Sequence, residues 1–119
     1  MIDIKPFIAE QLSQVAAVEL SYNGNFRTLP LIVMTETGNE AEIVIQNTDC
    51  VSRITIQLDI YAETAAETER IAADVNSAMT SKGFRRSFSE AVYDEDKPRR
   101  CMRFTCGIDE VAGRILTIN

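Results

Sequence analysis

The side chains that most often carry catalysis are scarce in this chain. Its 119 residues include no histidine, which excludes both Ser-His-Asp and Cys-His catalytic arrangements. The five glycines, at positions 24, 38, 83, 107 and 113, are too scattered to form a phosphate-binding loop. A carboxylate pair such as Asp59 with Glu63 is the weakest alternative, because nothing in the pattern places the two in one cleft. We therefore expect no catalytic residues and no cofactor.

Three cysteines, Cys50, Cys101 and Cys106, are the remaining candidates for covalent or metal chemistry. Without a CxxC motif or a histidine, they do not predict a zinc site. Cys101 and Cys106 are five residues apart on an expected strand, so they should face opposite sides and not form a disulfide. We expect three reduced thiols that behave as small buried hydrophobic residues. The acidic run Asp94-Glu95-Asp96 lacks calcium-loop spacing and is typical of a solvated hairpin tip.

Positive charge is concentrated in one part of an otherwise acidic chain. The net charge is −6, from 12 basic and 18 acidic residues, yet seven basic residues fall between positions 82 and 103. They are Lys82, Arg85, Arg86, Lys97, Arg99, Arg100 and Arg103. The simpler interpretation is a solvated face with local partners such as Glu90, Asp94 and Asp96. The functional alternative is a patch that docks on an acidic surface of a neighbouring subunit. Duplex DNA is a weaker third alternative, because the rest of the chain is acidic.

A second candidate surface is the polar face of the clearest predicted strand, residues 52–61. Its apolar side chains alternate with polar ones, which predicts an antiparallel sheet with one covered face. The apolar set is Ile54, Ile56, Leu58 and Ile60, and the polar set is Arg53, Thr55, Gln57, Asp59 and Tyr61. The polar set meets either water or another protomer, since Tyr and Arg are favoured at interfaces.

Helical spacing predicts two helices that cover this sheet. The first runs from Ile4 to Val15, with Asp3 as its cap and Pro6 in its first turn. The second runs from Ala65 to Ser81, between the capping-box spacing of Thr64 and Glu67 and a glycine at position 83. The segment from Val18 to Tyr22 fits either a strand or a continued helix, and residues 22–25 indicate a turn.

Five further segments are predicted to be strands, and two turns separate four of them. An apolar strand at residues 31–34 is followed by a turn at Gly38-Asn39 and a short strand at 42–46. Strands at 84–93 and 100–108 are joined by a hairpin loop at 94–98, and residues 115–118 predict an edge strand. The order predicts an α+β domain, with two helices packed on a mainly antiparallel sheet.

Bulk composition bounds the class of protein. A length of 119 residues, with 45% hydrophobic and 25% charged residues, is typical of a single globular domain spanning residues 1–119. No apolar run approaches the roughly 20 residues that cross a bilayer, and no secretory signal is recognisable. An acidic chain with a pI near 4.6 lacks the positive field that attracts nucleic acid or anionic membranes.

Several segments in a fixed order resemble a known family. Residues 54–63, Ile-Thr-Ile-Gln-Leu-Asp-Ile-Tyr-Ala-Glu, precede an acidic helix that ends in residues 81–86, Ser-Lys-Gly-Phe-Arg-Arg. Residues 92–96 and a strand from Arg99 through Phe104 follow, and residues 29–33, Leu-Pro-Leu-Ile-Val, lie upstream. Over about residues 4–110 the chain resembles the small tail-completion proteins of long-tailed bacteriophages and prophages, also called tail terminators or tail-to-head joining proteins. Met34 or a neighbour occupies the region where the family usually has a tyrosine.

The resemblance implies a structural virion protein without enzymatic activity. It would assemble as a ring, typically a hexamer, that caps the tail tube and joins tail to head. Its partners would be the tail-tube protein and the head-connector protein, and it would reside in the tail or neck of the virion after synthesis in the bacterial cytoplasm. DNA would pass through without specific binding, past an acidic lumen. The candidate lumen residues are Glu36, Glu40 and Glu42; the candidate interface residues are Arg53, Tyr61, Arg85, Arg86, Arg99, Arg100 and Arg103.

Two alternatives to the terminator role stay open at this point. A head-closure or minor tail protein of the phage neck would share the size and acidity, and its partners would distinguish it. A small cytoplasmic ligand-binding or regulatory domain would need a concave apolar pocket with converging polar groups.

Overall fold

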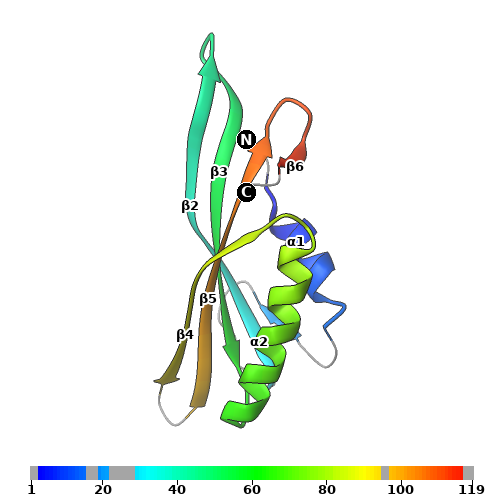
Figure 1. The fold of residues 1–119 in the computed structure, drawn as a ribbon, viewed down its shortest axis with the longest axis vertical. Helices are drawn as coiled ribbons and strands as arrows, with labels where there is room; N and C mark the ends of the chain where they lie inside the picture. The colour runs from blue at the N-terminus through cyan, green and yellow to red at the C-terminus, as the bar shows by residue number, and fades with distance from the viewer. Residues whose placement is uncertain (1–2, 16–18, 22–28, 95–96, 117–119) are drawn as a thin grey trace.

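The computed structural model describes residues 3–15, 19–21, 29–94 and 97–116, and within them a single sheet organises the molecule (Figure 1). Its strands are β1 (Glu19–Ser21), β2 (Leu31–Ile45), β3 (Thr48–Tyr61), β4 (Arg85–Asp94), β5 (Lys97–Asp109) and β6 (Arg114–Leu116). The order is β1-β2-β3-β5-β4, with β6 paired to the end of β5 beyond β4. Only β1 and β2 are parallel among these pairs. The helices α1 (Lys5–Leu12) and α2 (Ala65–Thr80) pack on one face, which confirms the α+β prediction.

The core lies between this face and the two helices. The apolar set of the 52–61 strand is fully buried, as the alternation predicts. Against it pack the predicted stripe of α2 and the even-numbered residues of β5, namely Thr68, Ile71, Ala72, Val75, Met79, Met102, Phe104, Cys106 and Ile108. Each fully buried Ile, Leu or Phe side chain contributes about 1.5–3 kcal/mol. Burial of these side chains fixes the register of the sheet, since a slip by one residue would turn them outward.

The ends of α2 form as the sequence predicts. The Thr64 hydroxyl accepts a hydrogen bond from the Glu67 amide at 3.1 Å, which satisfies one free N–H of the first turn. After Thr80 the chain leaves the helix through Gly83, whose φ of 94° is unfavourable for a residue with a Cβ atom.

The first helix is shorter than its pattern suggests. It ends at Leu12, although Val15 is still buried against the core. Its N-cap is Ile4, and the Asp3 carboxylate instead accepts a hydrogen bond from the Lys5 amide at 3.1 Å. Pro6 lies in the first turn, as predicted, where its missing N–H leaves no helical hydrogen bond unmade.

The predicted turn at Gly38-Asn39 is wrong. Strand β2 runs unbroken through both residues, which pair with Thr55 and Ile54 of β3. Gly38 instead follows a β-bulge, and a Cβ atom there would meet Thr55 at an ordinary 3.7 Å. The true turn is at Gln46-Asn47, where both φ angles are positive, at 51° and 63°, as in the tight turns that suit a twisted hairpin.

The result is a hairpin that extends well beyond the body of the molecule. We call residues 40–53, the far parts of β2 and β3 with their turn, the arm (Figure 1). Residues 40–49 are all exposed, and the whole molecule measures 51 × 24 × 22 Å.

The C-terminal half matches the predictions closely. Strands β4 and β5 form the expected hairpin, and β6 pairs with β5 at residues 107–109. The predicted turn at 22–25 and the end of the last strand, residues 117–118, lie outside the described residues. No helix in the described part of the chain is long and apolar enough to span a bilayer.

Candidate interaction surfaces

The face of the sheet away from the helices carries a connected polar cluster, although only its centre is buried. The guanidinium of Arg99 donates to Asp59 Oδ1 from both Nε, at 3.0 Å, and Nη2, at 2.9 Å. Gln57 donates to the other carboxylate oxygen at 2.9 Å, and its own Oε1 accepts from Arg103 Nε at 3.0 Å. The Asp59 and Arg99 side chains are 10% and 23% exposed. The cluster joins β3 to β5 and fixes the positions of both arginines.

Two aromatic rings extend this cluster. The Arg99 guanidinium carbon lies 5.8 Å from the centre of the Tyr61 ring, and that of Arg103 lies 4.8 Å from the Phe88 ring. Both distances are within the range of cation–π attraction. Tyr61 is buried, whereas Arg103 is exposed and Phe88 half-buried, so Arg103 and Phe88 are the part of the cluster that a partner can reach.

Burial and this cluster set the acidities of nearby groups. Burial disfavours the charged form of Arg99, but the hydrogen bond and charge of Asp59 outweigh it and raise the pKa of the guanidinium. Burial, reinforced by the Asp59 charge, raises the pKa of the Cys101 thiol, and burial alone raises the pKa of Cys106 to about 12. All three cysteines are free, with Cys50 half-buried and the other two buried. Burial shields Cys101 and Cys106, as expected for small hydrophobic residues, whereas Cys50 is partly exposed, contrary to that expectation.

The basic segment does not form one patch, contrary to its appearance in the sequence. Arg99 and Arg103 lie on the face away from the helices, while Arg100 turns toward α2. There it pairs with Glu69 at 2.7 Å and donates to Ser89 at 2.9 Å. Arg86 is also on the helix side, 3.3 Å from the Asn76 amide oxygen. Successive strand residues point to opposite faces, and this divides the segment.

Two of these arginines have acidic partners that are distant in the sequence. Arg99 pairs with Asp59 and Arg100 with Glu69. Of the partners expected from the sequence, the side chains of Asp94 and Asp96 lie outside the described part of the chain. The interface role of the candidate set remains a prediction. Arg85, Arg86 and Arg103 are the exposed members that form no ion pair with a described residue, and Arg86 donates a hydrogen bond to Asn76.

The candidate acidic lumen residues all lie on β2, but they do not form one line. Glu36 is half-buried opposite Ile56, on the helix side of the sheet. Glu40 is exposed opposite Arg53, on the other side, because cross-strand partners share a face. Glu42 is exposed and pairs with Arg53 at 3.2 Å. Their lumen role is untested, and Glu40 and Glu42 belong to the arm.

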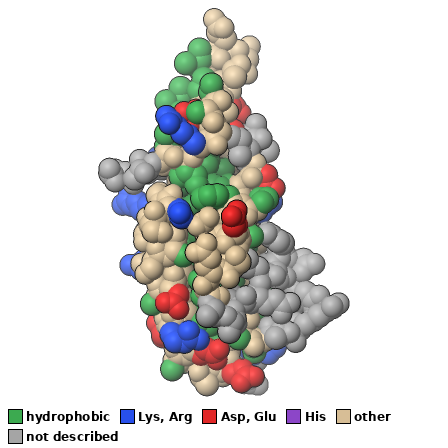
Figure 2. Space-filling model, turned by 90° about the vertical axis from the view of Figure 1, so that its right-hand side faces the viewer, with side chains coloured by type: hydrophobic (Ala, Val, Ile, Leu, Met, Phe, Trp, Pro, Cys, Tyr) green, Lys and Arg blue, Asp and Glu red, His purple; other side chains and the backbone are tan. Residues whose placement is uncertain are grey.

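An apolar tip on the arm is the surface that sequence reasoning missed. Ile43, Val44 and Ile45 are 50%, 53% and 60% exposed. Figure 2 shows hydrophobic side chains close to the far end of the arm. The sequence does contain an indication of this surface, namely three consecutive β-branched residues. A strand with one buried face alternates apolar and polar residues instead. The short strand predicted at residues 42–46 is present, but the sequence does not show that it pairs beyond the body of the molecule.

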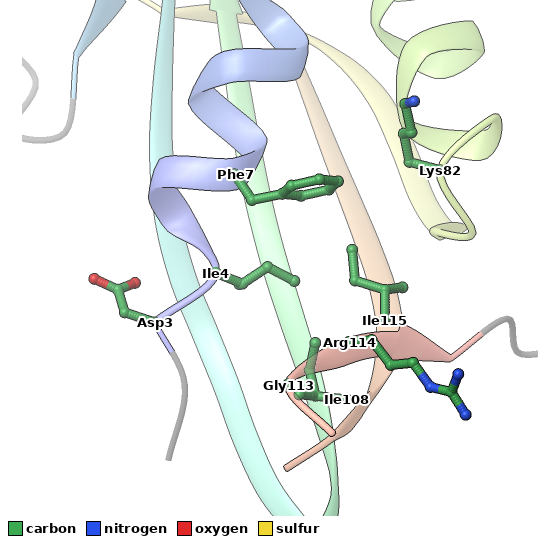
Figure 3. Close-up of a pocket in the computed structure, with 8 residues that line it drawn as sticks. All are labelled: Asp3, Ile4, Phe7, Lys82, Ile108, Gly113, Arg114 and Ile115. Atoms are coloured by element: carbon green, nitrogen blue, oxygen red, sulfur yellow. The ribbon is translucent and has the colours of Figure 1, made fainter. Parts of the chain in front are cut away.

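A hollow of about 370 Å³ lies near the base of the arm, between the start of α1 and β6. Its walls are the apolar side chains of Ile4, Phe7, Ile108 and Ile115. In Figure 3 Phe7, Ile4 and Ile115 project into the same space, whereas the charged ends of Asp3 and Arg114 point away from it. Lys82, at the end of α2, stands on its rim.

The acidic residues and cysteines of the described chain do not gather into a metal-binding cluster. Within the described residues no three His, Cys, Asp or Glu side chains lie close enough together to hold a metal ion. The Asp59 carboxylate forms an ion pair with Arg99 and accepts a hydrogen bond from Gln57. Glu63 is exposed and lies just before α2.

Comparison with known proteins identifies a similar shape and no family. No protein-family model and no curated protein matches the chain. Among solved structures, the gp17 protein of bacteriophage SPP1 is similar, with 17% sequence identity and a TM-score of 0.49. The match covers 86% of this chain and 87% of that one. At this identity and TM-score the likeness carries no argument about what this chain does.

Proposed function

We propose that this chain is a non-enzymatic structural protein of a bacteriophage tail that works by binding other protein subunits. In the finer form of the proposal, several copies close a ring, typically a hexamer, that caps the tail tube and joins it to the head connector. The virion tail or neck is then its location. The resemblance of residues 4–110 to the tail-completion family supplies the identity of the assembly.

The observation that carries the binding role is the arm. A two-stranded hairpin that ends in three half-exposed β-branched residues is a poor surface for a monomer, because exposed apolar groups favour association. The same molecule presents an apolar hollow elsewhere on its surface. A tip and a hollow at different places make a heterologous contact, and such contacts close into rings when the rotation between copies permits.

The charge distribution agrees with a role around DNA that does not grip it. The chain carries a net charge of −6, and the exposed carboxylates of Glu40 and Glu42 lie on its longest projection. Like charges would let DNA slide through a ring lumen.

Light scattering tests the proposal directly. The mass of the chain should be measured over a range of protein and salt concentrations, alone and with the tail-tube protein from the same source. A discrete ring, formed alone or induced by the tube protein, is the expected result. A persistent monomer that ignores the tube protein would refute the proposal. Binding to the portal or adaptor protein in place of the tube protein would assign the chain to head closure.

A further inference from the structure

We infer that the arm of one copy seats its apolar tip, Ile43-Val44-Ile45, in the hollow between α1 and β6 of a second copy of this chain. The inference rests on the proposed function for its setting, a closed assembly of identical subunits. It adds the contact by which neighbouring subunits would hold each other.

The tip is shaped for insertion. In a half-buried strand apolar side chains alternate with polar ones, so that one face meets water. Here three consecutive residues are apolar and 50–60% exposed, so the end of the arm presents apolar groups on both of its faces. A surface that is apolar on both faces is best covered by a cavity that surrounds it.

The hollow has the matching size and chemistry. A cavity of roughly 150 Å³ holds a group the size of benzene, so a volume of about 370 Å³ has room for two branched aliphatic side chains. Its walls are isoleucines and a phenylalanine, and its charged residues point outward (Figure 3). A polar small ligand would find no converging hydrogen-bond partners inside, whereas an aliphatic tip needs none.

The charges around the two surfaces are complementary. The arm carries three acidic residues, Glu40, Glu42 and Asp49, against one arginine, Arg53, whose ion pair with Glu42 leaves Glu40 and Asp49 as its main negative groups. The residues around the hollow carry two positive charges, on Lys82 and Arg114, against one negative charge, on Asp3. Arg114 is 3.8 Å from Asp109, which leaves Lys82 as the main positive group on the rim. Opposite charges at the rim of an apolar contact steer the partners and fix their orientation.

The tip does not reach the hollow of its own chain. Ser52 pairs with Ile108, which lines the hollow, and Val44 pairs with Asp49, three residues farther along β3. At about 3.3 Å per residue the tip therefore stands roughly 10 Å beyond the hollow. In Figure 1 the arm extends past β6 and away from α1, the two elements that border the hollow, so the occupant comes from another molecule.

Pairing of β2 edges between copies is the competing geometry, and the strand itself opposes it. Strand β2 has three irregularities in its register, at Glu36/Gly38, Ala41/Ile43 and Ile43/Val44. Bulges of this kind twist an edge strand and interrupt its row of hydrogen-bonding groups, which hinders pairing with another strand.

Mixed cross-linking tests the contact, in a Cys50→Ser background that leaves two buried thiols. One batch carries Val44→Cys and the other Arg114→Cys, and the two are mixed under oxidising conditions with the tail-tube protein present. We expect a disulfide-linked pair of chains. The matched control replaces Arg114→Cys by Glu63→Cys, at an exposed site before α2. Equal yields with the two partners would overturn the inference.

Solution mass provides the second measurement. Val44→Asp should reduce the assembly to monomers without changing the unfolding midpoint, since the side chain is 53% exposed. Ala66→Asp, which places the same charge at an exposed alanine far from the arm, should leave the assembly intact. A ring that survives Val44→Asp refutes the arm contact and leaves the proposed function standing. A cross-linked dimer without a ring supports the contact and refutes the ring. Monomers without cross-links refute both.

Discussion

Replacing Asp59 by Asn tests whether the polar cluster on the face away from the helices stabilises the fold. The change keeps the shape of the side chain but removes the charge that faces Arg99 at 2.9 Å. Removing one partner of a buried ion pair costs about 3–5 kcal/mol, whereas an exposed pair contributes about 0–1 kcal/mol. Asp59 and Arg99 are 10% and 23% exposed, which places them nearer the buried limit. We therefore expect a loss of about 2–3 kcal/mol in the free energy of unfolding.

Urea unfolding at a fixed protein concentration measures this loss. With a denaturant slope of about 1–3 kcal/mol per molar, the midpoint should fall by roughly 0.7–3 M. Glu42→Gln is the matched control, because it breaks an ion pair with Arg53 whose side chains are 39% and 52% exposed. It should cost less than about 1 kcal/mol. If the two variants shift the midpoint equally, burial does not control the strength of these pairs and the reasoning fails. Arg99→Met combined with Asp59→Asn should cost less than the sum of the single changes.

Four further predictions concern the ends of α2 and the thiols. Thr64→Ala removes the cap of α2 and should cost about 1 kcal/mol in urea unfolding, whereas Thr64→Ser should not. Gly83→Ala should cost about 1–2 kcal/mol, because φ is 94° there, and an equal cost for Gly38→Ala would contradict this reason. In the native protein a thiol reagent at pH 8 should modify Cys50 alone, because Cys101 and Cys106 are buried. In denaturant the same reagent should modify all three thiols. Because Cys106 has a folded pKa of about 12 against 9.0 ordinarily, the unfolded thiol ionises first, so stability should fall as pH rises above about 9. Cys106→Ala should weaken that dependence; an unchanged pH profile would refute it.

Helices and strands with a regular spacing of apolar residues could be predicted from the sequence, most accurately where a capping residue also marks the end. Helix α2 was expected at residues 65–81 and runs from Ala65 to Thr80, because its apolar stripe, its Thr64 cap and its glycine exit agree. The 52–61 alternation likewise identified the buried face of β3.

Turn residues misled the prediction where tertiary pairing outweighed local preference. Gly38 and Asn39 are common in turns, yet neither is confined to one, and hydrogen bonding to β3 holds them in an extended strand. Gln46-Asn47 forms the real turn with two positive φ angles, although Gln is an unusual residue for that conformation. The exposure of Ile43–Ile45 follows from this difference in turn position. With the turn at residues 46–47, these residues lie on a hairpin longer than the body that could cover it.

The divided basic segment shows which arginines remain for a partner. Residues 99 and 100 are adjacent in sequence, but strand geometry sends them to opposite faces, where Asp59 and Glu69, 40 and 31 residues away, neutralise them. A docking role for either would require breaking an existing ion pair, which offsets the energy gained from a new one. Arg103 is exposed, and the described side chains that it contacts, Gln57 and Phe88, are neutral, so they leave its charge uncompensated. If an acidic subunit docks on this face, Arg103 and the exposed Arg85 of the neighbouring strand are therefore the positive groups that it meets.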